Sequence, residues 1–163
     1  MNPKANQKIK VYLCGSITPN YKTRQWRNEL TSIIDESLSG SIKIINPTKN
    51  GFNKTIESIK DYDEFFKRID NTQNILKRID YQLIKNSDVI ICNVSIFDIQ
   101  KPPIGTIYEL AWADHHRIPV IGIISTEENP YIKHPWIRDS FAYSVYDVKG
   151  VVFLLKQFFV PFI

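Results

Sequence analysis

The chain has 163 residues, a length typical of one domain with a single hydrophobic core. Hydrophobic residues make up 43% and charged residues 23% of the sequence, an ordinary balance for a globular protein that excludes a disordered chain and a coiled coil. The net charge of +4 comes from dispersed basic residues rather than from a concentrated stripe. We therefore expect no nucleic-acid polymer as a partner. The net charge is equally compatible with a small anionic ligand and with the absence of a ligand.

The longest apolar runs, 89–92 and 151–155, are far shorter than the ~20 residues of a membrane span. The polar N-terminus lacks the apolar stretch of a signal peptide, so we expect a cytoplasmic protein without membrane contact. The two cysteines, Cys14 and Cys92, lie inside apolar runs, where we expect them to be reduced and buried. Their spacing does not indicate a structural zinc site.

The first half of the chain alternates apolar strand-like runs with a helical pattern. Residues 8–15 predict a strand that closes at Gly15, and residues 21–38 predict a helix with one apolar face. A second short strand is expected over 42–45, and a loop over 48–58.

The second half continues the alternation. A long polar-rich segment, 59–86, predicts a helix with a break near Asn71. The remaining expected elements are a strand at 89–94, a helix at 105–116, a strand at 118–124, a loop at 127–138, a strand at 143–146 and a helix at 148–159.

This order of elements predicts the α/β class, with a flavodoxin-like or Rossmann-like parallel sheet of about five strands and helices on both faces. Ligands of such sheets bind beyond the carboxyl ends of the strands, near the point where the strand order reverses. The rule draws attention to the loops after Gly15, Val94 and Ile124.

The loop after the first strand begins Gly15-Ser16-Ile17. Its backbone N–H groups can face an anion at the start of the following helix, but these residues alone favour a plain turn between strand and helix. No glycine-rich dinucleotide motif and no Walker-type lysine are present.

Two further segments carry carboxylates. Asp80 lies beside the apolar face of the predicted helix, whereas Asp88, just before a strand, is more simply explained as a turn residue. In the third segment, Thr106 and Glu109 match a helix capping box, yet Gly105 would let a ligand approach a carboxylate held at the helix start. Capping and catalysis are equally good interpretations of Glu109 at this point.

In this order and spacing, the segments 12–17, 80–91 and 105–113 resemble the nucleoside 2-deoxyribosyltransferase family, which includes the deoxynucleoside 5′-monophosphate N-hydrolases. The resemblance extends over about residues 8–158 and implies a single domain of this type across 1–163. It also implies a homo-oligomer with sites shared between subunits, a nucleoside or nucleotide substrate, and no metal or organic cofactor.

The resemblance implies three catalytic roles. Glu109 would attack C1′ of the deoxyribose and form a glycosyl ester, Asp80 would help to protonate the departing base, and the Tyr12 hydroxyl would orient the nucleophile. The substrate contacts expected at the strand ends and in the helix start are Gly15, Ser16, Ile17, Asp88, Asn93, Ser95, Gly105 and Thr106.

His134 occupies, by loose alignment, a position that in this family reaches the 5′ end of a substrate in the neighbouring subunit. An exposed loop histidine explains it equally well. The apolar groups at 135–137 and 158–163 add to the expectation of an oligomer, because a large exposed apolar patch usually marks an interface.

The chain departs from the family pattern where many transferases carry an aspartate that contacts the sugar's 5′-hydroxyl. Residues 101–103 read Lys-Pro-Pro instead, and the nucleotide hydrolases also lack that aspartate. A second departure, Ala111-Trp112 for the usual Gly-Tyr, is tolerable within a helix. The leading hypothesis is a deoxyribosyltransferase, the alternative is a deoxynucleoside monophosphate N-glycosidase, and a third is a nucleotide-binding protein without catalysis.

Overall fold

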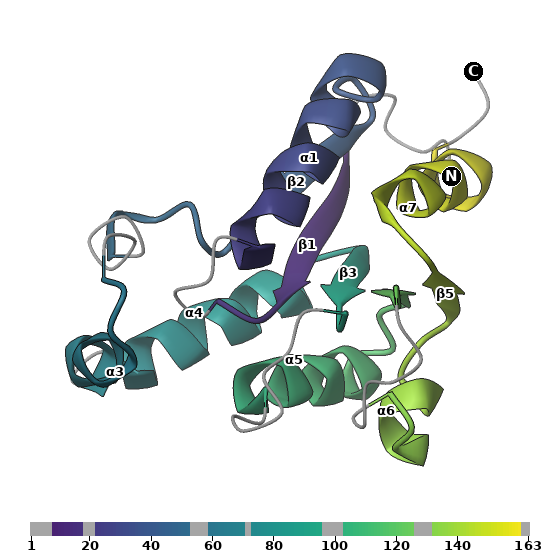
Figure 1. The fold of residues 1–163 in the computed structure, drawn as a ribbon. Coiled ribbons are helices and arrows are strands. Elements are labelled where there is room, and N and C mark those ends of the chain that lie inside the picture. The colour runs from purple at the N-terminus through teal and green to yellow at the C-terminus, as the bar shows by residue number, and fades with distance from the viewer. Residues whose placement is uncertain are drawn as a thin grey trace.

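The computed structural model describes residues 8–17, 22–52, 59–70, 73–95, 103–125 and 132–160. Within them, one parallel sheet has the strand order β2-β1-β3-β4-β5 (Figure 1). The strands are β1 (Ile9–Gly15), β2 (Ile42–Ile45), β3 (Val89–Asn93), β4 (Val120–Ile123) and β5 (Tyr143–Val145). The predicted α/β class and all five predicted strands are confirmed.

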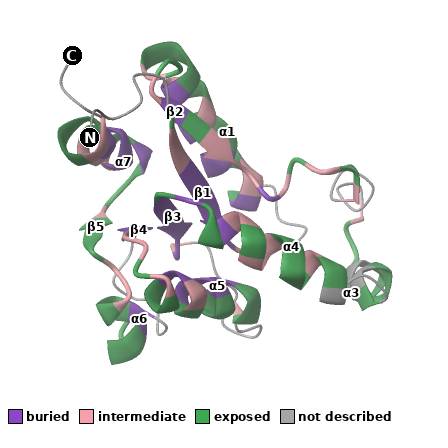
Figure 2. Ribbon diagram, turned by 180° about the vertical axis from the view of Figure 1, so that it is seen from behind, coloured by how far each residue is buried: buried purple, intermediate pink, exposed green. Residues whose placement is uncertain are grey.

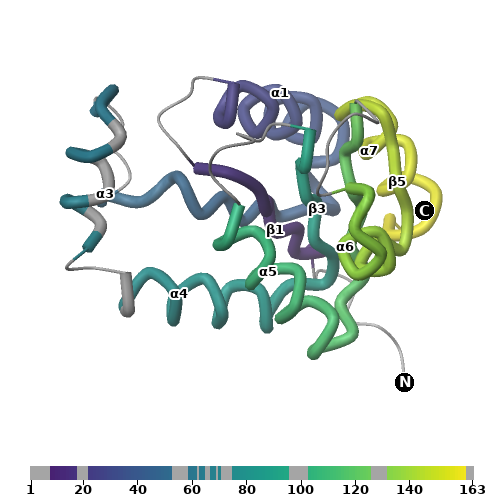
Figure 3. Tube along the Cα trace, turned by 60° about the horizontal axis from the view of Figure 1, so that its bottom comes forward, coloured from purple at the N-terminus to yellow at the C-terminus, as the bar shows by residue number. Residues whose placement is uncertain are grey.

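Helices cover both faces of this sheet. The helices are α1 (Lys22–Ser37), α3 (Tyr62–Asp70), α4 (Gln73–Lys85), α5 (Ile104–His115), α6 (Pro135–Asp139) and α7 (Val148–Leu154), which continues as the π-helical turn η1 (Leu155–Phe159). Figures 1 and 3 show α1 and α7 on one face, α4 and α5 side by side on the other, and α3 standing away from the sheet. None of the helices in the described part of the chain has the length and hydrophobicity needed to cross a membrane.

The central strands are buried on both faces, which explains their nearly continuous apolar sequences (Figure 2). Val11 and Leu13 of β1 pack on one side against Leu30 and other apolar residues of α1 and α7. The alternate residues, Tyr12 and Cys14, belong to the second core cluster, with residues of α4 and α5. Because successive side chains of a strand point to opposite faces of the sheet, Tyr12 and Cys14 both point toward α5.

Two predicted segments differ from the structure. The predicted helix 59–86 is two helices, α3 and α4, shorter than predicted but separated at residues 71–72, in agreement with the predicted break near Asn71; residues 71–72 themselves lie outside the described residues. The predicted loop 127–138 is wrong at its end, because Pro135 begins the short helix α6. A proline at the first helical position is a helix-start signal that the loop prediction overlooked. Residues 53–58 and 126–131 are not described, so the predicted loops are untested in those parts.

Gly15 ends β1 at the point where the strand order reverses, because β2 lies on one side of β1 and β3 on the other. It is paired in register with Asn93, the last residue of β3. Its φ of +142° is rarely adopted by residues with a side chain, and a Cβ there would lie 2.9 Å from the Asn93 carbonyl oxygen. Glycine is thus required where the carboxyl ends of the two central strands meet.

We predict that Gly15→Ala lowers the free energy of unfolding by roughly 2–4 kcal/mol, because it adds backbone strain to a steric clash. Gly40→Ala is the matched control, since a Cβ at Gly40 meets no atom within 4 Å; it should change stability by less than about 1 kcal/mol. Urea unfolding of both variants measures the difference. Equal losses would contradict the steric explanation.

Candidate active site

The side chain of Glu109 lies between α5 and β1 and is only 7% exposed. The Tyr12 hydroxyl donates a hydrogen bond to Glu109 Oε1 at 2.6 Å, and the Cys14 thiol donates to Oε2 at 3.0 Å. Because Tyr12 and Cys14 are alternate residues of one strand, they present two donors to the two oxygens of one carboxylate. The predicted proximity of Tyr12 and Glu109 is thereby found in the structure.

The structure does not support the capping interpretation of Glu109. The helix α5 begins at Ile104 with Pro103 at its N-cap, and no side chain forms a cap hydrogen bond. Thr106 is a buried residue within the first turn rather than the cap, and Glu109 bonds to β1 instead of to the helix start. A carboxylate that a helix does not need for capping is available for other chemistry.

Burial raises the pKa of Glu109, because a carboxylate loses its hydration inside the protein. Hydrogen bonds from Cys14 and Tyr12, the positive charge of Arg27 and the backbone amide of Gly15 act in the opposite direction. Burial also raises the pKa of Tyr12 and that of Cys14, which keeps both groups protonated as donors. These groups therefore offset only part of the effect of burial, and the pKa of Glu109 stays above its usual value in a largely dry site.

Asp80 on α4 faces the same group of side chains and is half-buried. Burial and the negative charge of Glu109 raise the pKa of Asp80 to about 7, and the nearby Tyr12 hydroxyl offsets part of this effect. A carboxyl group with such a pKa is partly protonated near neutral pH and can give or take a proton. The structure therefore brings together Asp80, Tyr12 and Glu109, the three residues predicted to be catalytic.

Arg27, which sequence reasoning did not select, is fully buried beneath the turn that follows β1. Its guanidinium donates to the carbonyl oxygens of Gly15 at 2.8 Å and Ser16 at 3.1 Å, and also to that of Thr23. The spacing of Arg27, Leu30 and Ile34 places the arginine on the apolar face of α1, and this was the signal available in the sequence. Arg27 both shapes the turn and supplies positive charge near Glu109.

The loops after β3 and β4 are tied together by Ser95. Its hydroxyl donates to the Ile123 carbonyl at 3.0 Å and accepts from the Ser125 amide at 2.7 Å, while its own amide donates to Asn93 Oδ1 at 2.9 Å. Asn93 and Ser95 thus lie at the predicted edge of the sheet, with side chains that organise the loops.

Three other predicted substrate contacts lie near this edge or at the start of α5. Ser16 and Ile17 follow β1 directly and are half-buried. Gly105 lies in the first turn of α5, where a Cβ would meet open space. Their expected substrate contacts stay predictions.

Asp88 is not part of this cluster. It is an exposed residue before the amino end of β3, where its Oδ2 accepts from the Lys10 amide at 2.7 Å. This hydrogen bond fits the alternative interpretation of Asp88, a structural residue that joins β3 to β1, and its expected substrate contact stays a prediction.

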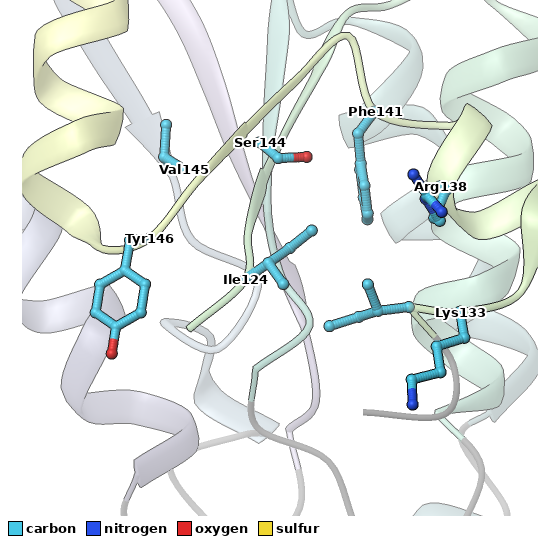
Figure 4. Close-up of a pocket in the computed structure, with 8 residues that line it drawn as sticks. Ile124, Lys133, Arg138, Phe141, Ser144, Val145 and Tyr146 are labelled. Atoms are coloured by element: carbon cyan, nitrogen blue, oxygen red, sulfur yellow. The ribbon is translucent and has the colours of Figure 1, made fainter. Parts of the chain in front are cut away.

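Among the described residues, no hydrogen bond or ring contact joins His134 to the Glu109 cluster. It is the exposed N-cap residue of α6, and its ring lies 6.4 Å from the ring of Trp136. A hollow of about 860 Å³ adjoins this segment at the ends of β4 and β5 (Figure 4). Its lining comprises Ile124, Ile132, Lys133, Arg138, Phe141, Ser144, Val145 and Tyr146.

Comparisons with protein-family models and with curated proteins found no match to this chain. Among solved structures, a conserved protein from Enterococcus faecalis V583 is similar, with a TM-score of 0.55 and 16% identity over 91% of this chain and 88% of that one. This similarity shows a shared fold.

Two further solved structures are similar to a lesser degree. They are a 2-desoxiribosyltransferase from Leishmania mexicana (TM-score 0.46, 16% identity, 72% of this chain) and the CMP N-glycosidase BcmB from Clostridium botulinum (TM-score 0.47, 16% identity, 91% of this chain). The matched region spans 65% of the Leishmania protein and 99% of the Clostridium protein.

The raised pKa of Asp80 predicts a pH-dependent stability. Because the folded state holds this proton more tightly than the unfolded chain does, stability falls as the pH rises from the usual value of 3.8 to about 7. Between pH 5 and pH 8 the wild-type protein should lose on the order of a few kcal/mol of unfolding free energy, measured by urea unfolding. Asp80→Asn should remove this loss.

Asp114→Asn, at an exposed position of α5, is the matched control and should keep the wild-type pH dependence. Carboxyl NMR of the wild-type protein should show an Asp80 midpoint near pH 7. A midpoint near 4, or an Asp80→Asn protein that loses stability as steeply as wild type, would contradict the buried environment.

Proposed function

We propose that this protein is an enzyme that cleaves the N-glycosidic bond of 2′-deoxynucleosides and transfers the deoxyribose to another base. The observation that carries the proposal is the buried Glu109 carboxylate, held by Tyr12 and Cys14 beside the partly protonated Asp80. N-glycoside cleavage by a covalent route needs a carboxylate nucleophile and a nearby proton donor. The motif resemblance supports the same assignment.

In the proposed reaction, a Glu109 oxygen forms a bond to C1′ as the bond between C1′ and the base nitrogen breaks. The departing nitrogen takes the electron pair of that bond, and the Asp80 carboxyl supplies a proton. A second base then attacks C1′, gives its proton to Asp80 and releases Glu109. The hydrogen bonds from Tyr12 and Cys14 orient the carboxylate for both steps.

A deoxynucleoside 5′-monophosphate N-glycosidase is the second candidate, with water in place of the acceptor base. It is favoured by Lys101-Pro102-Pro103, which stands where many transferases carry an aspartate toward the 5′-hydroxyl, and by the net positive charge. A nucleotide-binding protein without catalysis is less well supported, because Glu109 bonds to side chains of β1 rather than capping α5.

The reaction is tested by incubating the protein with each deoxynucleoside and each deoxynucleoside monophosphate, with and without a second free base, and by separating the products chromatographically. A new deoxynucleoside that appears only with the acceptor base supports the transferase. Base release from a monophosphate without an acceptor supports the hydrolase. No turnover of any of these substrates would reject both.

Glu109→Gln should reduce turnover by at least roughly 10⁴-fold while the protein stays folded, because the amide keeps the shape of the side chain and loses the nucleophile. Mass spectrometry of acid-quenched wild-type enzyme should find a deoxyribosyl group on the peptide that contains Glu109. Glu29→Gln, on the exposed side of α1, is the matched control and should be fully active. A folded Glu109→Gln protein with near-normal turnover would remove Glu109 from the mechanism.

We further propose that the protein assembles as a homo-oligomer in which His134 contacts the 5′ end of a substrate in a neighbouring subunit. If the substrate carries a 5′-phosphate, His134→Ala should raise KM for the monophosphate at least about 10-fold more than for the free nucleoside, because a charge-assisted hydrogen bond is lost. His115→Ala, exposed at the end of α5, is the control. Light scattering that finds an active monomer would refute the shared site.

A further inference from the structure

The thiol of Cys14 touches the carboxylate that the proposed function makes the nucleophile. Its Sγ lies 3.0 Å from Glu109 Oε2, and the side chain is completely buried. From its apolar sequence context, this cysteine was expected only to fill space. We propose that Cys14 is a positioning residue whose thiol holds Glu109 in the orientation needed to attack the sugar; the inference rests on the proposed function.

The geometry gives Cys14 a task that Tyr12 alone cannot perform. Tyr12 donates to Oε1, so the Cys14 thiol is the second side-chain donor to the carboxylate, beside the backbone amide of Gly15. Cys14 anchors Oε2, and together the two donors fix the plane of the carboxylate. Both donors belong to β1, a strand hydrogen-bonded on both sides to β2 and β3, so they are held on a rigid support.

The chemistry of a thiol suits this position. An S–H group is a weak donor, so it orients a carboxylate without withdrawing as much of its negative charge as a hydroxyl or an ammonium would. Burial raises the pKa of Cys14, which keeps the proton on sulfur. The other titratable or charged groups that act on Glu109 are Tyr12 on the same strand, Asp80 on α4 and Arg27 on α1.

The chain supplies a matched control in Cys92. It lies in register with Cys14 on the neighbouring strand β3, it is equally buried, and it belongs to the same core cluster. Within the described residues, it makes no hydrogen bond to Glu109. Replacing either cysteine with alanine therefore deletes the same atoms from the same core, but only one replacement removes a donor from the carboxylate.

The experiment measures the pH dependence of kcat and KM for wild type, Cys14→Ala, Cys14→Ser and Cys92→Ala. Losing the Cys14 hydrogen bond raises the pKa of Glu109, so the acid limb of the Cys14→Ala profile should move to higher pH by roughly 0.5–1 unit. We expect its kcat to fall about 10- to 100-fold with KM changed less than about 3-fold. Cys14→Ser should restore the acid limb, and Cys92→Ala should keep the wild-type profile.

An unchanged acid limb in Cys14→Ala, or an equal shift in Cys92→Ala, would overturn the inference. Carboxyl NMR of the resting protein tests the same contact without catalysis, since the Glu109 titration midpoint should rise in Cys14→Ala and not in Cys92→Ala. If no substrate is turned over, or if Glu109→Gln remains active, the proposed function fails. A positive NMR result in that case would still establish the thiol contact and would show that it does not serve a nucleophile.

Discussion

The contact between β1 and α5 places an ionisable carboxylate in the core. Burying this group costs desolvation free energy, and the neighbouring elements supply the groups that offset it. An isolated buried carboxylate is strongly unfavourable unless hydrogen bonds and charge replace the lost water. Glu109 obtains these from Tyr12 and Cys14, with Arg27 as the compensating charge. The donors are effective only if β1 and α5 keep their relative position, so the packing of the two elements and the electrostatics of the site depend on each other.

The sheet topology explains why β1 carries this contact. As a central strand it has a helix layer on each face, so alternate residues belong to different cores. Tyr12 and Cys14 face α5, while Leu13 packs toward α1. Arg27 then reaches from α1 to the turn at the end of the strand, where it binds the Gly15 carbonyl. The site therefore combines groups from both faces at the point where the strand order reverses.

The sequence allowed the fold to be predicted because each strand is short, apolar and bounded by turn residues, and the period of α1 is clear. The core of the site was also predictable, since Tyr12, Asp80 and Glu109 are carried by motifs whose order resembles a known family. Cys14 and Arg27 were missed for a physical reason. Their importance lies in contacts between elements that are distant in the chain. The local sequence pattern indicates only a small hydrophobic residue at Cys14 and an ordinary helix residue at Arg27. Asp88 precedes β3 in the sequence, and the structure places it at the amino end of that strand, where it bonds to β1.

The two carboxylates of the cluster share a desolvated setting, so burial raises the pKa of both. What separates them is the supply of compensating groups. Glu109 has two side-chain donors, a backbone amide and the charge of Arg27, whereas the nearby Tyr12 hydroxyl is what opposes the raised pKa of Asp80. Glu109 thus has more groups that stabilise its ionised form than Asp80 has, and the negative charge of Glu109 in turn raises the pKa of Asp80. Under the proposed function, the division into nucleophile and acid follows from this unequal set of neighbours, since the two side chains have nearly the same intrinsic acidity.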